Sequence, residues 1–163
     1  MNGKCQKRGA MRRTVGLVMA GALALAMALG LVMTSGSAAL AAGHRIQIYE
    51  IYYNPPGPDT HANSQLNREW VQLHNTSGQR ITLTGWTLRD KQDHVYKFGT
   101  YKIKAHGYVK IHTGKGTNTQ TDRYWGRSWY VWNNTGDQAT LKDNNSNVID
   151  RCSYSGGGSH KIC

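Results

Sequence analysis

The sequence is poor in acidic residues, cysteine and proline. Its 163 residues include 9 Asp and Glu against 20 Lys and Arg, with three Cys, three Pro and one Phe, and the formal net charge is +11. This length suits a single domain and argues against a multidomain enzyme. The chain has one long apolar run, at its N-terminus, so a polytopic membrane protein is not expected. The five Trp and nine Tyr argue against a disordered chain.

The N-terminal segment has the composition of a secretory signal peptide. Basic residues within Lys4–Arg13 precede a 19-residue apolar run, Val15–Met33, and Ala39-Leu40-Ala41 offers the small residues that signal peptidase requires. We predict that residues 1–41 are a cleaved signal peptide, with Met11 as an alternative start. The mature protein would be secreted, either released or retained at the cell wall, without a stable membrane span. The alternative is a retained anchor, because 19 apolar residues just span a bilayer.

Removal of this segment lowers the net charge but leaves the protein basic. Residues 1–41 hold five of the 20 basic residues and no acid, so the mature chain has 15 Lys and Arg against 9 acids, a net charge of +6. Such a charge favours anionic partners in general. Of the lysines at positions 97, 102, 104 and 110, we expect Lys102, Lys104 and Lys110 to line one sheet face. The alternative is that this charge only keeps the protein soluble.

Two cysteines remain in the mature chain, Cys152 and Cys163. An even pair in an exported protein predicts a disulfide. This disulfide would tie the Gly-rich tail, residues 155–163, back to the last strand, and closing that loop would contribute roughly 3 kcal/mol. A metal site with His160 is the alternative, but the second pair of ligands that zinc requires is missing.

Short alternating runs indicate an all-β domain over residues 42–154. Apolar runs of a few residues recur between Gly, Pro, Asn, Asp and Ser, and we find no convincing amphipathic helix. This pattern is typical of a β-sandwich, here with roughly eight or nine short strands. Residues 130–132 are expected to form one of them, and 114–127 a long loop. The expected core residues are Trp70, Val71, Leu73, Leu83, Trp86, Leu88, Val109, Ile111, Trp132 and Leu141.

The first run, Ile46–Tyr53, shows how strand faces are assigned from sequence. Successive side chains of a strand point to opposite faces. Strict alternation would therefore group Ile46 with Ile48 and Glu50, and would place Tyr49, Ile51 and Tyr53 on the other face.

Several blocks resemble the lamin tail domain, an immunoglobulin-like β-sandwich. The matching blocks include Glu69-Trp70-Val71-Gln72-Leu73-His74-Asn75, Leu83-Thr84-Gly85-Trp86-Thr87-Leu88-Arg89-Asp90 and Trp132-Asn133-Asn134-Thr135-Gly136-Asp137. Together the blocks cover about residues 45–154 in the family's order. The signal peptide and the cysteine-containing tail resemble the secreted bacterial branch. The resemblance implies an immunoglobulin-like fold and a binding or structural module, and the absence of a coiled-coil rod gives no support for a filament role.

No catalytic signature appears in the sequence. It has no Gly-x-Ser-x-Gly motif, no His-Glu-x-x-His motif and no phosphate-binding Gly-rich loop before a helix. The neighbours Asp93 and His94 are a poor acid–base pair, because adjacent side chains point apart. We expect Glu69 and Asn75, which flank a strand, to hydrogen-bond to nearby backbone. The protein is therefore interpreted as a non-enzyme that needs no cofactor.

A calcium site is the one cofactor alternative that the sequence leaves open. The oxygen-bearing residues Asp59, Asn63, Asn67 and Glu69 lie in or beside a polar loop. Secreted sandwiches can use Ca²⁺ to stiffen such loops. Their spacing matches no known calcium motif, and a solvated polar loop is the alternative.

The segment 113–132 is the most suggestive candidate for binding. It mixes cations with planar rings, the combination that single-stranded nucleic acid requires. We expect Trp125 and Arg127 to be exposed and Trp132 to join the core. The candidate binding residues are Lys115, Arg123, Tyr124, Trp125, Arg127, Trp129 and Tyr130.

Three functions remain open at this point. The preferred hypothesis is a secreted, non-catalytic module that recognises a polyanion, either nucleic acid or an anionic wall polymer. The same rings could instead stack on the sugars of a wall glycan, or two or three of them could simply close one end of the core. The alternatives are a structural or protein-interaction module of the cell envelope, with an envelope protein as its partner, and a small secreted hydrolase.

Overall fold

The computed structural model describes residues 45–163, which contain eleven β-strands and one short helix. The predicted signal peptide lies outside the described residues. Within those residues, no helix has the length and hydropathy needed to cross a bilayer. The elements are β1 (Ile46–Tyr52), α1 (Asn63–Leu66), β2 (Trp70–Asn75), β3 (Ile81–Thr82), β4 (Thr87–Arg89), β5 (Val95–Lys97), β6 (Lys102–Ile103), β7 (Tyr108–His112), β8 (Asp122–Tyr124), β9 (Asp137–Lys142), β10 (Val148–Tyr154) and β11 (His160–Ile162).

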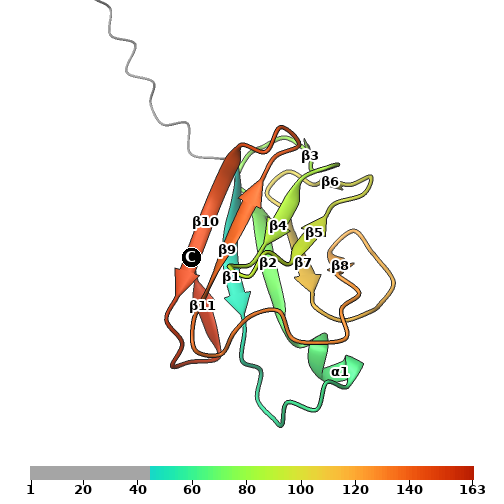
Figure 1. The fold of residues 1–163 in the computed structure, drawn as a ribbon. Coiled ribbons are helices and arrows are strands. Elements are labelled where there is room, and N and C mark those ends of the chain that lie inside the picture. The colour runs from blue at the N-terminus through green and yellow to red at the C-terminus, as the bar shows by residue number, and fades with distance from the viewer. Residues whose placement is uncertain (1–44) are drawn as a thin grey trace, which may run out of the picture. The chain divides into compact units, whose positions relative to one another are not determined.

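Two sheets pack face to face. The five-stranded sheet has the order β11-β1-β2-β7-β8, and the four-stranded sheet has the order β10-β9-β4-β5. In Figure 1 the four-stranded sheet lies in front of the five-stranded one, and the β3–β6 ribbon lies at the upper end. Pairings are antiparallel except that of β7 with β8. This arrangement confirms the predicted immunoglobulin-like sandwich.

Two strands that the sequence did not indicate extend the five-stranded sheet at its edges. The residues of β8 are Asp-Arg-Tyr and those of β11 are His-Lys-Ile, so neither has the apolar alternation that marks a strand. The expected strand at 130–132 is absent, because the N–H groups of Val131 and Trp132 donate to a carboxyl side chain instead of a neighbouring strand.

A β-bulge corrects the predicted faces of β1. Its register against β2 shifts between Ile48 and Glu50. Because the bulge inserts one extra residue, the inward face changes parity along the strand. The buried set is therefore Ile46, Ile48, Ile51 and Tyr53.

The core combines aliphatic side chains with buried aromatic residues such as Phe98 and Trp132. Eight of the ten expected core residues are buried: Val71, Leu73, Leu83, Leu88, Val109, Ile111, Trp132 and Leu141. Two expectations do not hold. Trp70 is half-buried on the outer face of the five-stranded sheet, because β2 turns Val71 inward and alternation then turns its neighbour outward. Trp86 is also half-buried and packs against the margin of the core.

The buried carboxyl group of Glu69 joins β2 to the segment 113–132. Its Oε1 accepts hydrogen bonds from Thr113 Oγ1 at 2.6 Å, from the Val131 N–H at 2.9 Å and from the Trp132 N–H at 3.3 Å. The side chain is 0% exposed. Desolvation by burial raises the pKa of Glu69 to about 7, and the hydrogen bond from Thr113 and those from the two backbone N–H groups oppose that rise.

Asn75, at the other end of β2, holds two neighbouring turns together. Its Nδ2 donates to the carbonyl oxygens of Gln79 at 2.6 Å and Lys104 at 2.8 Å. Its Oδ1 accepts from the Ser77 N–H and hydroxyl. Glu69 and Asn75 thus both hydrogen-bond to nearby backbone, as the sequence predicted.

The predicted disulfide joins Cys152 on β10 to Cys163, with the Cα atoms 5.8 Å apart. The predicted tail, residues 155–163, is more ordered than expected, because it returns as β11 and pairs with β1. The bond therefore fastens the edge strand of the five-stranded sheet to the edge strand of the other.

The raised pKa of Glu69 predicts a specific pH dependence of stability. The folded-state pKa of about 7 lies above the usual value of 4.5. The stabilisation of the folded state by protonated Glu69 is therefore fully present below pH 4.5. It is lost as the pH rises through 7, which lowers the free energy of unfolding by about 3 kcal/mol. Glu69→Gln should flatten the pH dependence of the unfolding free energy between pH 4.5 and 8, measured by urea denaturation. Parallel curves for the two proteins would contradict this assignment.

The disulfide predicts a loss of stability when both cysteines are replaced. The Cys152→Ser, Cys163→Ser double variant should unfold with about 3 kcal/mol less free energy, because an 11-residue separation no longer restrains the unfolded chain. Amide hydrogen exchange of β11 should accelerate more than that of β2. Equal stability of both proteins under oxidising conditions would refute the proposed role of the bond.

Candidate functional site

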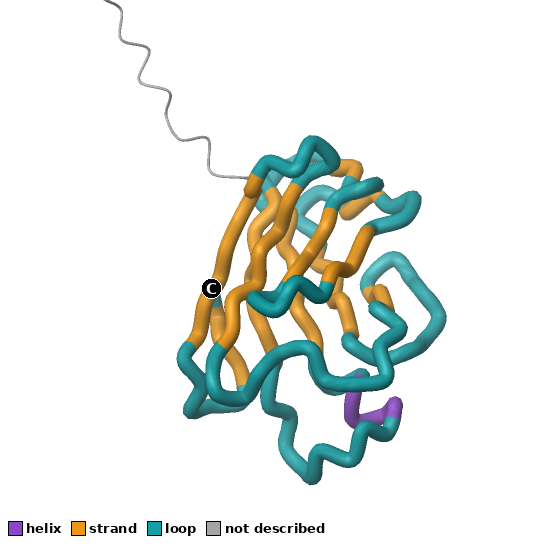
Figure 2. The backbone as a smooth tube through the Cα atoms, viewed as in Figure 1, coloured by secondary structure: helices purple, strands orange, loops and turns teal. Residues whose placement is uncertain are grey.

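The segment 113–132 crosses the lower end of the sandwich on its way from β7 to β9 (Figure 2). It contains β8, whose parallel pairing places Arg123 opposite Ile111 and Tyr124 opposite His112. Because neighbouring strand residues face opposite sides, the predicted binding residues are divided between two surfaces. The segment therefore does not form one continuous basic aromatic surface.

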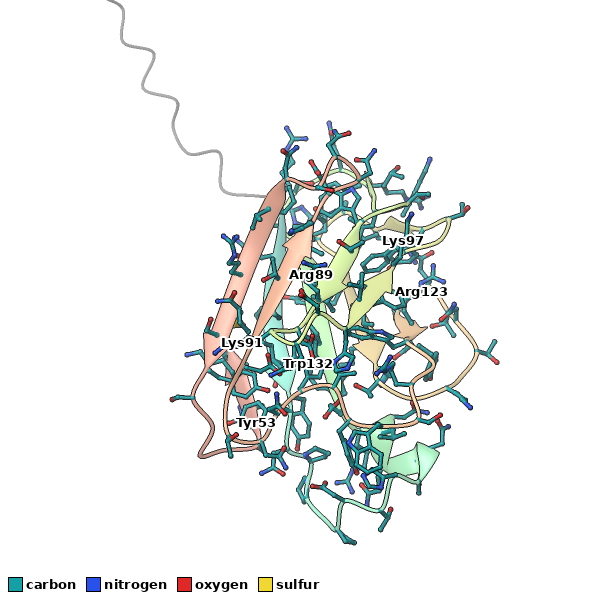
Figure 3. All side chains as sticks on the ribbon, viewed as in Figure 1. Tyr53, Arg89, Lys91, Lys97, Arg123 and Trp132 are labelled. Carbon is teal, nitrogen blue, oxygen red and sulfur yellow. A yellow bond between two sulfur atoms is a disulfide. The ribbon has the colours of Figure 1, made fainter. Side chains whose placement is uncertain are left out.

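Arg123 contributes to a basic pocket beside the β3–β6 ribbon (Figure 3 labels Arg123). This cavity of about 250 Å³ is lined by four cationic side chains and no acid. No ion pair joins any of the four to an acid within residues 45–163. We call it the basic pocket; it is lined by Arg80, Thr100, Tyr101, Lys102, Lys104, Gln120 and Arg123.

Hydrogen bonds tie together two of the three segments that form the basic pocket, residues 100–104 and 120–123. The guanidinium of Arg123 lies 4.0 Å from the centroid of the Tyr101 ring, a cation–π contact. The Tyr101 hydroxyl donates to the Gln120 carbonyl oxygen at 2.7 Å, and Gln120 Nε2 donates to the Lys102 carbonyl oxygen at 2.8 Å. Lys102 and Arg123 thus lie on one hydrogen-bonded frame, and Arg80 and Lys104 line the same pocket beside them.

Sequence reasoning missed Arg80 and did not group Lys102 and Lys104 with Arg123. These residues meet because β3 pairs with β6, and two-residue strands leave no periodic signal. The prediction that Lys102, Lys104 and Lys110 share a sheet face does not hold. Lys110 lies on the outer face of the five-stranded sheet, with its Nζ 3.8 Å from the centroid of the Trp70 ring.

Trp125 is not the exposed residue that the sequence suggested. It packs against the core, with its ring edge-on to Trp132 at 6.1 Å and near Tyr96 at 5.8 Å. Tyr124 stacks on His112 at 5.0 Å. Trp125 therefore packs on the core, whereas Tyr124 lies with His112 on the outer face of the five-stranded sheet.

Of the remaining predicted residues, Trp129 and Tyr130 lie against the loop that precedes α1, Lys115 lies beside α1, and Arg127 bonds to Thr113. Arg127 is half-buried rather than exposed, and the side chain of Lys115 is exposed. The backbone carbonyl oxygen of Lys115 accepts hydrogen bonds from Asn63 and Asn67 at 2.9 Å each. Trp129 stacks on the His61 imidazole at 3.6 Å, with Tyr130 tilted against the same ring at 5.5 Å.

The four calcium candidates do not converge on a cation site. Asn63 and Asn67 bind the backbone of Lys115, Glu69 is engaged inside the domain, and Asp59 lies 3.4 Å from Asn134. Over the described part of the chain, no three His, Cys, Asp or Glu side chains are grouped as metal ligands. Asn63 and Asn67 instead anchor the segment 113–132, at Lys115, to α1 and the residue after it.

Among the residues that the structure describes, two His–Asp pairs occur, and neither is the pair considered from sequence. His94 Nδ1 contacts the buried Asp90 at 2.6 Å, while Asp93 pairs with Arg89 at 3.1 Å. His112 Nε2 contacts Asp122 at 2.9 Å, and its Nδ1 contacts the Asn67 carbonyl oxygen. The hydrogen bond with His112, and then that from Thr121, lowers the pKa of Asp122.

Each of these pairs has a role in the fold. Nucleophilic catalysis requires a hydroxyl or thiol within hydrogen-bond reach of the base. Within residues 45–163, neither imidazole has such a contact. The His94 pair closes the β4–β5 hairpin, and the His112 pair holds β8 against β7.

The outer face of the five-stranded sheet presents a row of aromatic rings. Tyr52 stacks on Trp70 at 5.3 Å and on His160 at 5.9 Å, while Lys110 covers Trp70. A second group on this face joins Tyr108 to His74 at 4.1 Å and to Tyr49 at 5.2 Å. These rings pack on one another, so neighbouring side chains of the same protein cover their faces. They stabilise cross-strand pairing.

Comparison with known protein families agrees with the fold. No curated protein matches the chain. The family model described as Lamin Tail Domain matches residues 39–156, which is more than half of the chain. The chain therefore belongs to the lamin tail domain family.

Proposed function

We propose that this protein is an exported, non-catalytic interaction module that binds polyanions through the basic pocket. Family membership supports an immunoglobulin-like interaction module. The observation that points to a polyanion is the convergence of Arg80, Lys102, Lys104 and Arg123 on one pocket without an acid. Phosphate-rich polymers bind such clusters because they release condensed counterions on contact.

Export is part of the proposal. The N-terminal residues 1–41 have the composition of a signal peptide. The Cys152–Cys163 disulfide is typical of an oxidising compartment. The ligand would therefore be met outside the cytoplasm, where free nucleic acid and anionic wall polymers both occur.

A charge-matched pair of variants tests the pocket. Lys102→Gln, Lys104→Gln removes two cations from it. Lys91→Gln, Arg151→Gln removes two exposed cations elsewhere, and Figure 3 shows Lys91 well away from Arg123. Both double variants have the same net charge, so a difference in binding reports position rather than total charge.

Binding is measured by fluorescence anisotropy with labelled oligothymidylate, and by competition with inorganic polyphosphate. The affinity of the unmodified protein should fall steeply with salt. The pocket variant should bind several-fold more weakly, and its log–log salt slope should be shallower by about 1.4, since each lost contact to a single strand is worth about 0.7. The control variant should retain the slope. If neither polymer binds, binding is independent of salt, or the two variants behave alike, the proposal is wrong and a protein-interaction module without polyanion affinity is favoured.

A further inference from the structure

Trp129 is the most exposed of the large apolar side chains in the described part of the chain, at 62%. Its ring lies on the His61 imidazole, with centroids 3.6 Å apart and an interplanar angle of 21°. A cavity of about 430 Å³ is lined by Gly126, Arg127, Ser128 and Trp129. His61 does not line this cavity, so the cavity lies beside Trp129 without the imidazole forming part of its wall. Trp129 therefore differs from the mutually stacked rings on the five-stranded sheet.

His61, whose imidazole lies under the Trp129 ring, has an unfavourable backbone conformation. His61 has a backbone φ of +55°, in the left-handed region that residues other than glycine seldom adopt. This conformation costs about 1–2 kcal/mol. The surrounding loop maintains it, and Tyr130 packs against the same ring at 5.5 Å. The strained residue thus supports a tryptophan that projects into solvent, an arrangement that core packing alone does not require.

The cavity next to Trp129 combines a flat ring with positive charge. Arg127 lines it, and no acidic side chain does. The backbone that lines the cavity is held beside the end of β7. The Gly126 N–H donates to the Gly114 carbonyl oxygen and the Arg127 N–H donates to the Thr113 carbonyl oxygen, each at 2.9 Å. Space is open at Gly126, where an added Cβ would meet nothing within 4 Å. A ligand that fits this cavity has a planar, polarisable ring and an adjacent anionic group.

We infer that the polyanion is a single-stranded nucleic acid, and that an unpaired base stacks on Trp129 while a neighbouring phosphate contacts Arg127. This inference rests on the proposed function. Base–aromatic stacking with adjacent cations is how proteins bind single strands without sequence preference. A duplex offers no free base face. A neutral glycan would stack on the ring but would leave Arg127 without an anionic partner.

The test compares two strands that differ only in their bases. Labelled oligothymidylate is titrated against an abasic deoxyribose phosphate strand of equal length, which has the same charge. Trp129→Ala should weaken oligothymidylate binding by about 5- to 150-fold and leave the abasic strand unaffected. Trp129→Phe, which keeps a planar ring, should restore most of the affinity. Tyr108→Ala, which removes a different exposed ring, serves as the control and should leave both affinities unchanged.

The outcomes separate this inference from the proposed function. If both strands bind in a salt-dependent way and Trp129→Ala affects them equally or not at all, stacking is wrong while polyanion binding stands. If neither strand binds, both are wrong. Trp129-dependent binding of purified wall glycan without binding of oligothymidylate would assign the cavity to sugars and overturn the inference. Thermal unfolding of each variant shows whether a lost affinity reflects a lost fold.

Discussion

The segment 113–132, which contributes to both candidate binding surfaces, depends on one buried carboxyl group. Glu69 accepts hydrogen bonds from the hydroxyl at the start of this segment, Thr113, and from two backbone N–H groups at its end, Val131 and Trp132. These three donors would otherwise be buried without a partner, which costs more than a typical hydrogen bond gains. Glu69 thus holds the two ends of the segment together, and the residues between them form β8 and include the exposed Trp129.

The fold could be predicted from sequence because its main strands have a strong period of two. The alternation around Val71 and Leu73 and around Val109 and Ile111 places these four side chains inward, and all four are fully buried. The failures have local causes. A bulge after Ile48 shifts the parity of β1, and the two polar edge strands β8 and β11 rely on pairing rather than on apolar alternation.

The candidate site was less predictable than the fold, because its residues meet through tertiary structure. The basic pocket joins residues 80, 100–104 and 120–123, which no local pattern connects. Composition indicated that cations and rings matter in the segment 113–132, and Arg123 and Trp129 do border cavities. Composition could not show that Trp125 turns into the core, because only packing decides which of several neighbouring rings is buried.

The aromatic residues divide into two classes by what covers their faces. Those on the five-stranded sheet stack across strands, and the rings of Trp125 and Trp132 close the core, so these residues stabilise the sandwich. Trp129 is backed by an imidazole on one side and borders a cavity lined by Arg127. Lys102 and Arg123 lie on the frame that Tyr101 and Gln120 connect, and Arg80 and Lys104 line the same pocket. The domain thus has separate elements for charge and for stacking, and the segment 113–132 contributes to both.

The most direct test of this account is a map of backbone amide chemical shifts during titration with oligothymidylate at low salt. Binding through the two surfaces should shift amides in residues 100–104 and 120–129 and leave the outer face of the five-stranded sheet unchanged. Shifts concentrated on β1, β2 and β11, or no shifts at saturating ligand, would contradict it.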